Sequence, residues 1–87
     1  MKRYTKKGAD GAVAVAEANL PDALRRLAAF EDALAELAAS RSAIPAELER
    51  LKAEGKEKTV RYRELFGQKL MNNQNVLLFE RHGIKME

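Results

Sequence analysis

The stretch Thr59–Ile84, TVRYRELFGQKLMNNQNVLLFERHGI, decides the fold of this chain. Thr59 is a suitable N-cap, and Gly83 followed by Ile84 fits the Schellman motif that closes many helices. Between these two ends, apolar residues recur at helical spacing, namely Tyr62, Leu65, Phe66, Leu70 and Leu77, flanked by Met71, Val76 and Phe79. The pattern predicts one long helix over about residues 60–82.

The polar residues of this predicted helix are unusual for a surface helix, which would normally carry Glu and Lys. Arginine can hold a phosphate or carboxylate with two parallel hydrogen bonds. Asn and Gln can hydrogen-bond base edges or backbone groups, and an aromatic ring can stack on a nucleobase. The candidate residues for binding a ligand or partner are therefore Arg61, Tyr62, Arg63, Phe66, Gln68, Lys69, Asn72 and Asn73.

Two structural alternatives stand beside this interpretation. Asn73 lies within the apolar stripe, so it could set the register of an oligomer seam, as a buried Asn does in coiled coils. The run Asn72–Asn75 is also a candidate kink, because Asn is a poor helix former. The first alternative would leave the other polar residues simply solvated, and a kink would break the helix into two.

Residues 2–16 have the pattern of a β-hairpin, with a turn at Gly8–Gly11. A lone two-stranded hairpin is barely stable in water, so we expect it to lie on helices or to extend a sheet across a subunit boundary. Its basic cluster around Tyr4 could grip phosphates or could discourage edge-to-edge aggregation. The cluster comprises Lys2, Arg3, Lys6 and Lys7.

The middle of the chain predicts two further helices. Pro21 suits the first turn of a helix over about 21–40, which is rich in Leu and Ala. Ser40–Ser42 interrupts that pattern, and Pro45 then opens a short helix over about 45–54 that Gly55 ends. The expected fold is mainly α: an N-terminal β-hairpin followed by three helices within a single domain, 1–87. Its parts are the hairpin 2–16, a helical pair 21–54 and the long C-terminal helix 59–84.

Length and composition limit the classes of protein. An 87-residue chain with no cysteine builds only a thin core and has no disulfide to reinforce it, which favours a homo-oligomer, a dimer or higher. No apolar run approaches the roughly 20 residues of a membrane span, so we expect a cytoplasmic protein without a membrane partner.

Catalytic and cofactor motifs are missing from the sequence. His82 is the one histidine, too few for a zinc site without cysteines. The glycine turn lacks the Lys-Ser/Thr of a P-loop, and both serines, Ser40 and Ser42, have no base nearby in the sequence. We therefore expect neither an enzyme nor a metal or cofactor protein.

The formal net charge of +3 is unevenly distributed. The N-terminus is basic, residues 8–40 are acidic, and the chain from Arg41 onward is mildly basic. Such asymmetry can steer an anionic partner, and it can equally join subunits, basic end to acidic helix.

Two segments resemble small proteins encoded by phages and prophages of Gram-positive bacteria. The first runs from Lys2-Arg3-Tyr4-Thr5-Lys6-Lys7 through a glycine turn and Ala12-Val13 to Leu27-Ala28-Ala29-Phe30-Glu31-Asp32. The second comprises Gly55-Lys56, Tyr62-Arg63-Glu64-Leu65, Gln68-Lys69-Leu70, Phe79-Glu80 and Gly83-Ile84. Together they cover most of the chain. The sequence departs from many members after Asp32, where those have a Thr-Gly break.

The resemblance implies a phage accessory gene and transfers no catalytic residue. Such genes often encode small inhibitors of host defence or small regulators. The leading hypothesis is accordingly a non-enzymatic protein that binds a host defence protein or sequesters an anionic nucleotide signal between subunits. Arg61, Arg63 and Lys69 would then hold phosphate, Tyr62 or Phe66 would stack, and Asn72 or Asn73 would read a base edge. The alternatives are a small regulator that binds nucleic acid and a structural phage component.

Overall fold

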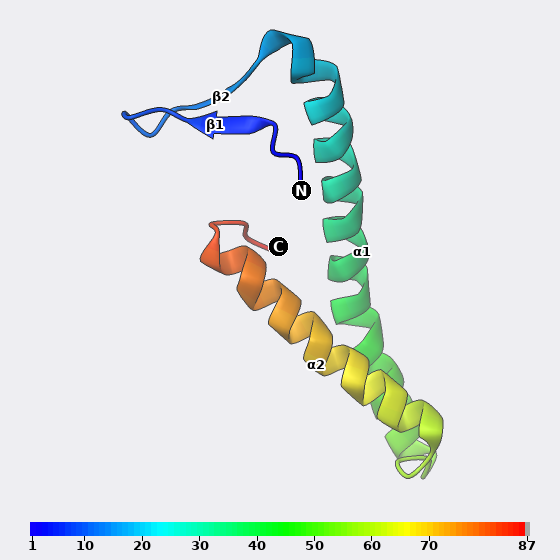
Figure 1. Cartoon of the computed structure of the whole chain (residues 1–87). Coiled ribbons are helices and arrows are strands. Elements are labelled where there is room, and N and C mark those ends of the chain that lie inside the picture. The colour runs from blue at the N-terminus through cyan, green and yellow to red at the C-terminus, as the bar shows by residue number, and fades with distance from the viewer. Residues whose placement is uncertain (87) are drawn as a thin grey trace. The chain divides into compact units, whose positions relative to one another are not determined.

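The computed structural model describes residues 1–86 and is mainly helical, with a short hairpin at its N-terminus (Figure 1). Strands β1 (Thr5–Lys7) and β2 (Val13–Val15) lead through a 3₁₀ turn, Glu17–Asn19, into helix α1 (Leu20–Ala53), and helix α2 (Val60–Arg81) follows. The chain divides into two compact units, the first from Met1 to Ala33 and the second from Leu34 onward.

In the first unit, β1 and β2 pair antiparallel, with Lys6 opposite Ala14. Gly11 adopts a left-handed conformation with φ 84°, which glycine tolerates without steric cost. The Asp10 carboxylate accepts a hydrogen bond from the Ala12 backbone N–H at 3.0 Å, which fixes the turn. The predicted hairpin is confirmed, although its strands are shorter than residues 2–16.

Tyr4 joins this hairpin to α1 within the first unit. The Arg26 guanidinium lies 4.3 Å from the centre of the Tyr4 ring, and the Lys2 ammonium lies 5.1 Å from it. Arg26 also donates a hydrogen bond to the Lys2 carbonyl. These contacts hold the segment before β1 against α1, while the two strands remain mostly exposed.

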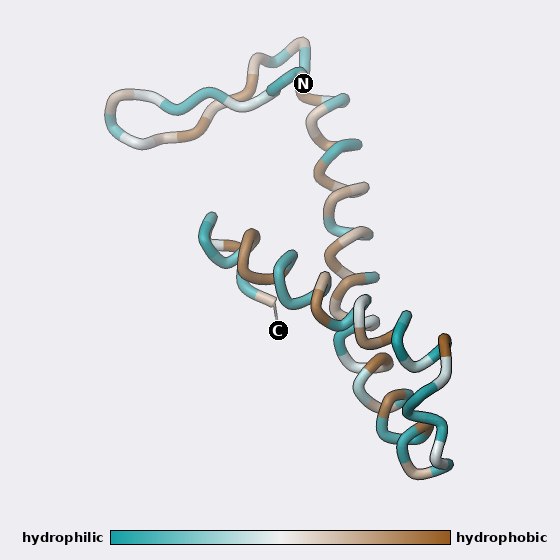
Figure 2. The backbone as a smooth tube through the Cα atoms, turned by 60° about the horizontal axis from the view of Figure 1, so that its bottom comes forward, coloured by the Kyte–Doolittle hydropathy of each residue, from teal (hydrophilic) through white to brown (hydrophobic). Residues whose placement is uncertain are grey.

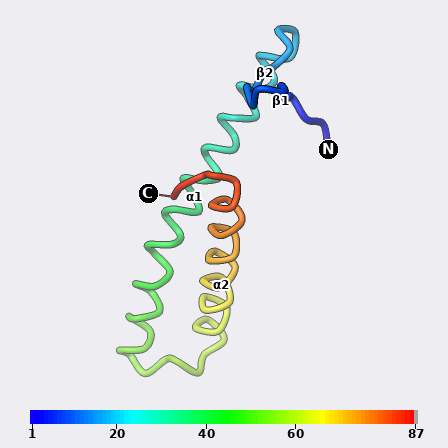
Figure 3. The backbone as a smooth tube through the Cα atoms, turned by 90° about the vertical axis from the view of Figure 1, so that its left-hand side faces the viewer, coloured from blue at the N-terminus to red at the C-terminus, as the bar shows by residue number. Residues whose placement is uncertain are grey.

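The second unit is a helical hairpin in which α2 runs back alongside the second half of α1 (Figure 3). Its core consists of Ile44, Leu48 and Leu51 from α1 and Leu65 from α2, with Tyr62 packed against them. Val76 is also buried. Because each buried aliphatic side chain contributes roughly 1.5–3 kcal/mol, this small set holds the two helices together.

Both ends of the connecting loop have caps that the sequence predicts. Gly55 has φ 72°, and the Lys56 N–H donates to the Leu51 carbonyl at 2.8 Å, which completes a Schellman motif at the end of α1. The Thr59 hydroxyl accepts from the Tyr62 N–H at 3.2 Å and so caps the start of α2.

The C-terminal end of α2 is also as predicted. The Ile84 N–H donates to the Phe79 carbonyl at 2.9 Å, and Gly83 has φ 82°. These are the marks of a second Schellman motif. Helix α2 is continuous across Asn72–Asn75, so that run does not divide it in two.

The prediction of three helices is wrong. Residues 20–53 form one helix, and Pro45 lies inside it rather than at the start of a new one. A proline there removes a helical hydrogen bond and costs about 3 kcal/mol. Ile44, Leu48 and Leu51 on either side of Pro45 are buried in the core, and their burial outweighs that cost.

Candidate functional site

A small cleft between the two helices of the second unit brings predicted site residues together with residues that the sequence did not single out. Its volume is about 130 Å³. Lys69, Asn72 and Asn73 line it from α2, and Ser40, Arg41, Ile44 and Pro45 line it from α1. No acidic side chain is among these lining residues.

Asn72 lines the cleft and is the one buried polar residue among residues 1–86, at 3% exposure. Its amide nitrogen donates to the Ser40 hydroxyl oxygen at 2.8 Å, and its carbonyl oxygen accepts from the Gln68 amide at 2.9 Å. A buried polar group is stable when its partners are supplied in this way. Asn72 therefore joins α2 to α1 and is not available to read a ligand.

The cations Arg41 and Lys69 stand at the cleft without partners. Neither forms an ion pair with any residue in the described part of the chain. Lys69 is half-buried and Arg41 is exposed. Since Asn73 follows Lys69 by four residues, the two lie on the same side of α2.

Ser40 adds a hydrogen-bond donor to this cleft. Its oxygen accepts the bond from Asn72, which leaves the hydroxyl proton available to donate. Arg41, Lys69, Ser40 and the Asn73 amide together offer donors and positive charge at one place. That chemistry suits an anionic group such as a phosphate or a carboxylate.

The remaining candidates on α2 do not converge on this cleft. Arg61 and Arg63 are exposed and two residues apart, so they point to different sides of the helix and cannot hold one phosphate together. Tyr62 packs against the core, which removes most of its ring from stacking partners. Phe66 is exposed on the side of α2 away from the buried Leu65 and Asn72.

Arg61 instead lies in the electrostatic field of an exposed charge network on α1. Arg50 hydrogen-bonds Glu47 and Glu54. The hydrogen bond from Arg50 holds the pKa of Glu47 below its ordinary value, and the positive charges of Arg50 and Arg61 lower this pKa further. The same carboxylates raise the pKa of the Arg50 guanidinium.

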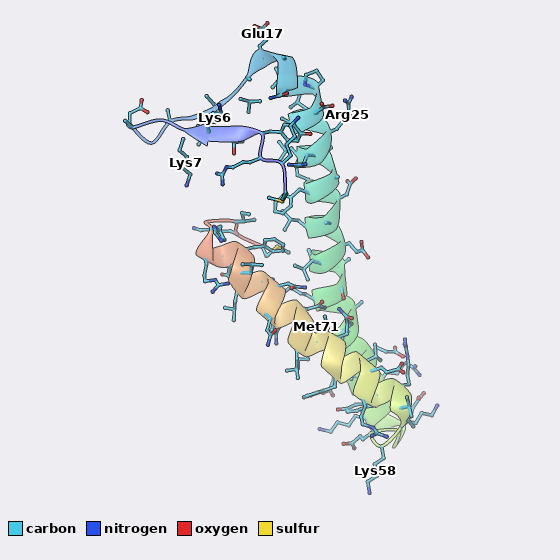
Figure 4. The ribbon with its side chains drawn as sticks, viewed as in Figure 1. Lys6, Lys7, Glu17, Arg25, Lys58 and Met71 are labelled. Carbon is cyan, nitrogen blue, oxygen red and sulfur yellow. The ribbon has the colours of Figure 1, made fainter. Side chains whose placement is uncertain are left out.

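The N-terminal basic cluster does not form a single face. Lys6 and Lys7 are neighbours on β1 and point to opposite sides of the hairpin (Figure 4). Lys2 lies against the Tyr4 ring, and the Arg3 side chain donates to the Thr5 carbonyl at 3.1 Å. These cations are spread around the hairpin rather than gathered for one phosphate.

Sequence reasoning missed Ser40 and Arg41, because it assigned them to a break between two helices. The signal was present in the spacing. Arg41 lies one turn before Pro45, and Pro45 has no N–H to bond the carbonyl of the residue four positions earlier. The polar pair Ser40–Arg41 therefore lies where α1 lacks one backbone hydrogen bond.

Among residues 1–86, no group of His, Cys, Asp and Glu side chains is placed to hold a metal ion. Neither long helix of the described chain has the length and apolar character needed to cross a membrane. Comparisons with protein-family models, with curated proteins and with solved structures find no match to this chain.

Proposed function

We propose that this chain is a non-enzymatic binding protein that recognises an anionic group of its target at the cleft between α1 and α2. The observation that carries the proposal is the pair of unpartnered cations, Arg41 and Lys69, beside two neutral donors, Ser40 and Asn73. A hydrogen bond from a cationic donor to an anion is stronger than a bond between neutral groups, and Arg can form two of them in parallel with a phosphate or carboxylate.

The size of the cleft defines what it would hold. A volume of about 130 Å³ is well below the roughly 300 Å³ of a site that encloses a whole small molecule. The cleft would therefore take a phosphate or carboxylate, with the rest of the target lying outside it. This revises the expected nucleotide site, because Arg61, Arg63 and Asn72 take no part.

The resemblance to small phage-encoded proteins supplies the biological setting of the proposal. In that setting the target is a component of host antiviral defence, namely a nucleotide signal with its phosphate in the cleft. An exposed carboxylate of a defence protein would satisfy the same chemistry and is the second outcome of the test below. The dispersed basic cluster of the hairpin gives no comparable support for a regulator that binds nucleic acid.

The test is binding of a panel of cyclic and linear dinucleotides and of inorganic phosphate, measured by isothermal titration calorimetry. The variant Arg41→Met/Lys69→Met removes the cleft cations, and we expect it to weaken binding at least tenfold. The matched control, Lys58→Met/Arg63→Met, removes the same charge from exposed positions outside the cleft and should bind as the unmodified chain does.

Equal weakening by both double variants would show that only net charge matters and would overturn the proposal. Absence of binding by every nucleotide and by phosphate would reject the nucleotide as target. In that case the unmodified chain and the control variant should both capture a host protein, and Arg41→Met/Lys69→Met should not. That result would identify a protein carboxylate as the bound group. Far-ultraviolet circular dichroism of Arg41→Met/Lys69→Met measures its helix content, so that unfolding of the variant is distinguished from loss of the binding site.

A further inference from the structure

The two helices of the second unit meet along a seam whose positions alternate three and four residues apart. This spacing is the heptad pattern of helices that pack side by side. Figure 2 shows hydrophobic and hydrophilic residues alternating along both helices. On α2 the seam positions are buried or half-buried, and all other residues of this helix are exposed. The seam positions are Leu34, Leu37, Arg41, Ile44, Leu48 and Leu51 on α1, and Tyr62, Leu65, Lys69, Asn72, Val76 and Phe79 on α2.

Observed contacts fix the register of this seam. Leu65 packs with Leu48 in the core, and Asn72 donates to the hydroxyl of Ser40 at 2.8 Å. Because the helices run antiparallel, each step along α1 matches an equal step back along α2. The register therefore pairs Leu51 with Tyr62, Leu48 with Leu65, Ile44 with Lys69, Arg41 with Asn72, Leu37 with Val76, and Leu34 with Phe79.

The two middle pairs interrupt this apolar seam with three polar residues. Asn72 has its hydrogen-bond partners, but Arg41 and Lys69 have no ion pair in residues 1–86. One cation stands on each helix, and both line the same cleft of about 130 Å³. Like charges so placed repel each other, and the repulsion opposes the pairing of the helices at this level.

Helix α1 is also weakened at this level. Pro45 lines the cleft and has no N–H to bond the carbonyl of Arg41. The missing backbone bond and the two unpaired cations therefore coincide along the seam.

The polar pairs divide the seam into two unequal parts. On the side of the connecting loop, the core residues Ile44, Leu48, Leu51 and Leu65 are only 4% to 9% exposed. Beyond the cleft, α2 continues as residues 73–81, which we call the far end. Its seam positions are Val76, which is buried, and Phe79, which is half-buried. Segments with less burial open locally at a lower free energy than the rest of a fold.

From these observations we propose that an anion in the cleft controls the pairing of the far end with α1. Without an anion, repulsion between Arg41 and Lys69 favours opening of the far end. A bound anion accepts hydrogen bonds from both cations, one on each helix, and so joins the helices beside the cleft. The proposal rests on the proposed function, since the anion is the group that the cleft binds. It adds that binding and helix pairing are coupled, because a ligand favours the state that it binds better.

Hydrogen–deuterium exchange of the full chain, measured with and without inorganic phosphate at constant ionic strength, tests the proposal. At a phosphate concentration about ten times its dissociation constant, amides of the far end should exchange roughly tenfold more slowly. Amides of α2 beside the loop-side core should change less, because that part stays paired in both states.

The variant Arg41→Met/Lys69→Met separates helix pairing from anion binding. Methionine removes the repulsion and places apolar side chains in the seam. The far end of this variant should therefore exchange several-fold more slowly than that of the unmodified chain without any phosphate, and phosphate should have no further effect. The matched control, Lys58→Met/Arg63→Met, removes the same charge outside the seam and should keep the behaviour of the unmodified chain.

A far end that exchanges as fast in the cleft variant as in the unmodified chain would overturn the proposal, because the cations would then not weaken the seam. Phosphate that binds in calorimetry but leaves far-end exchange unchanged would overturn the coupling alone and leave the proposed function standing. Absence of phosphate binding in calorimetry would count against both.

Discussion

The two faces of α2 differ in burial, and the number of apolar residues on each face does not predict which one is buried. The inner face buries Leu65, Asn72 and Val76 and so includes a polar amide. The outer face, the side away from α1, leaves five large apolar side chains exposed: Phe66, Leu70, Met71, Leu77 and Leu78. Three of them, Phe66, Leu70 and Leu77, belonged to the predicted apolar stripe. The inner face packs within the chain although it includes a polar amide, and five large apolar side chains on the other side stay exposed.

This difference shows that complementarity, rather than hydrophobicity alone, selects the face that packs within the chain. Asn72 finds Ser40 and Gln68 as partners, and Leu65 and Tyr62 meet the apolar line of Ile44, Leu48 and Leu51. A buried polar group without partners costs about 1–3 kcal/mol, so its partners are what make this face suitable for burial. The outer face has no corresponding surface on α1.

The largest effect should come from truncating the inner face. Leu65→Ala removes a core side chain and should lower the free energy of unfolding by about 2–5 kcal/mol, which would unfold much of this small unit. Leu70→Ala, the matched change on the outer face, should stay within about 0.5 kcal/mol in dilute solution. Urea unfolding followed by circular dichroism measures both. Equal losses would show that the two faces are not distinct.

A gain of intermediate size should follow from repairing α1 behind the inner face. Pro45→Ala restores a helical N–H and should raise the free energy of unfolding by roughly 1–3 kcal/mol. Pro21→Ala is the control, because Pro21 lies in the first turn of α1, where the missing N–H costs nothing. Thermal and urea unfolding of the two variants compare them. A destabilised Pro45→Ala variant would show that the proline ring itself is needed for packing.

The smallest effect concerns the polar contact of the inner face. The single variants Asn72→Ala and Ser40→Ala, together with the double variant, form a thermodynamic cycle. We expect a coupling free energy of about 0.5–1.5 kcal/mol, the usual contribution of one hydrogen bond. The exposed Asn73 supplies the control, and Asn73→Ala with Ser40→Ala should show no coupling. A coupling of zero for Asn72 would mean that this bond does not fix the pairing of the helices.

The helix ends could be predicted with accuracy because their signals are local. Thr59, Gly55, Gly83 and Ile84 act through hydrogen bonds within a few residues of themselves, and each behaves as predicted. The hairpin turn at Gly8–Gly11 is local in the same sense. Caps and turns depend on residue type and backbone conformation, and a few neighbouring residues determine both.

The break predicted at Ser40–Ser42 was wrong for the opposite reason. Ser40 and Pro45 are unfavourable in a helix judged by α1 alone, but α2 changes the balance by bonding Ser40 and by burying Ile44 and Leu48. The candidate site changed for the same reason. Asn72 looked like a reader of ligands and became a buried contact, while Arg41, predicted as loop, became part of the cleft.

The sequence by itself determined that this chain has a hairpin, a helix ending at Gly55 and a helix between Thr59 and Gly83, because those boundaries rest on local bonding. Only the tertiary structure decided that residues 20–53 form a single helix, that Asn72 faces inward and that Phe66 and Leu70 face outward. The physical reason is that burial is a property of two surfaces meeting. A polar side chain belongs inside when its partner lies on the other helix, and one segment of sequence cannot show that partner.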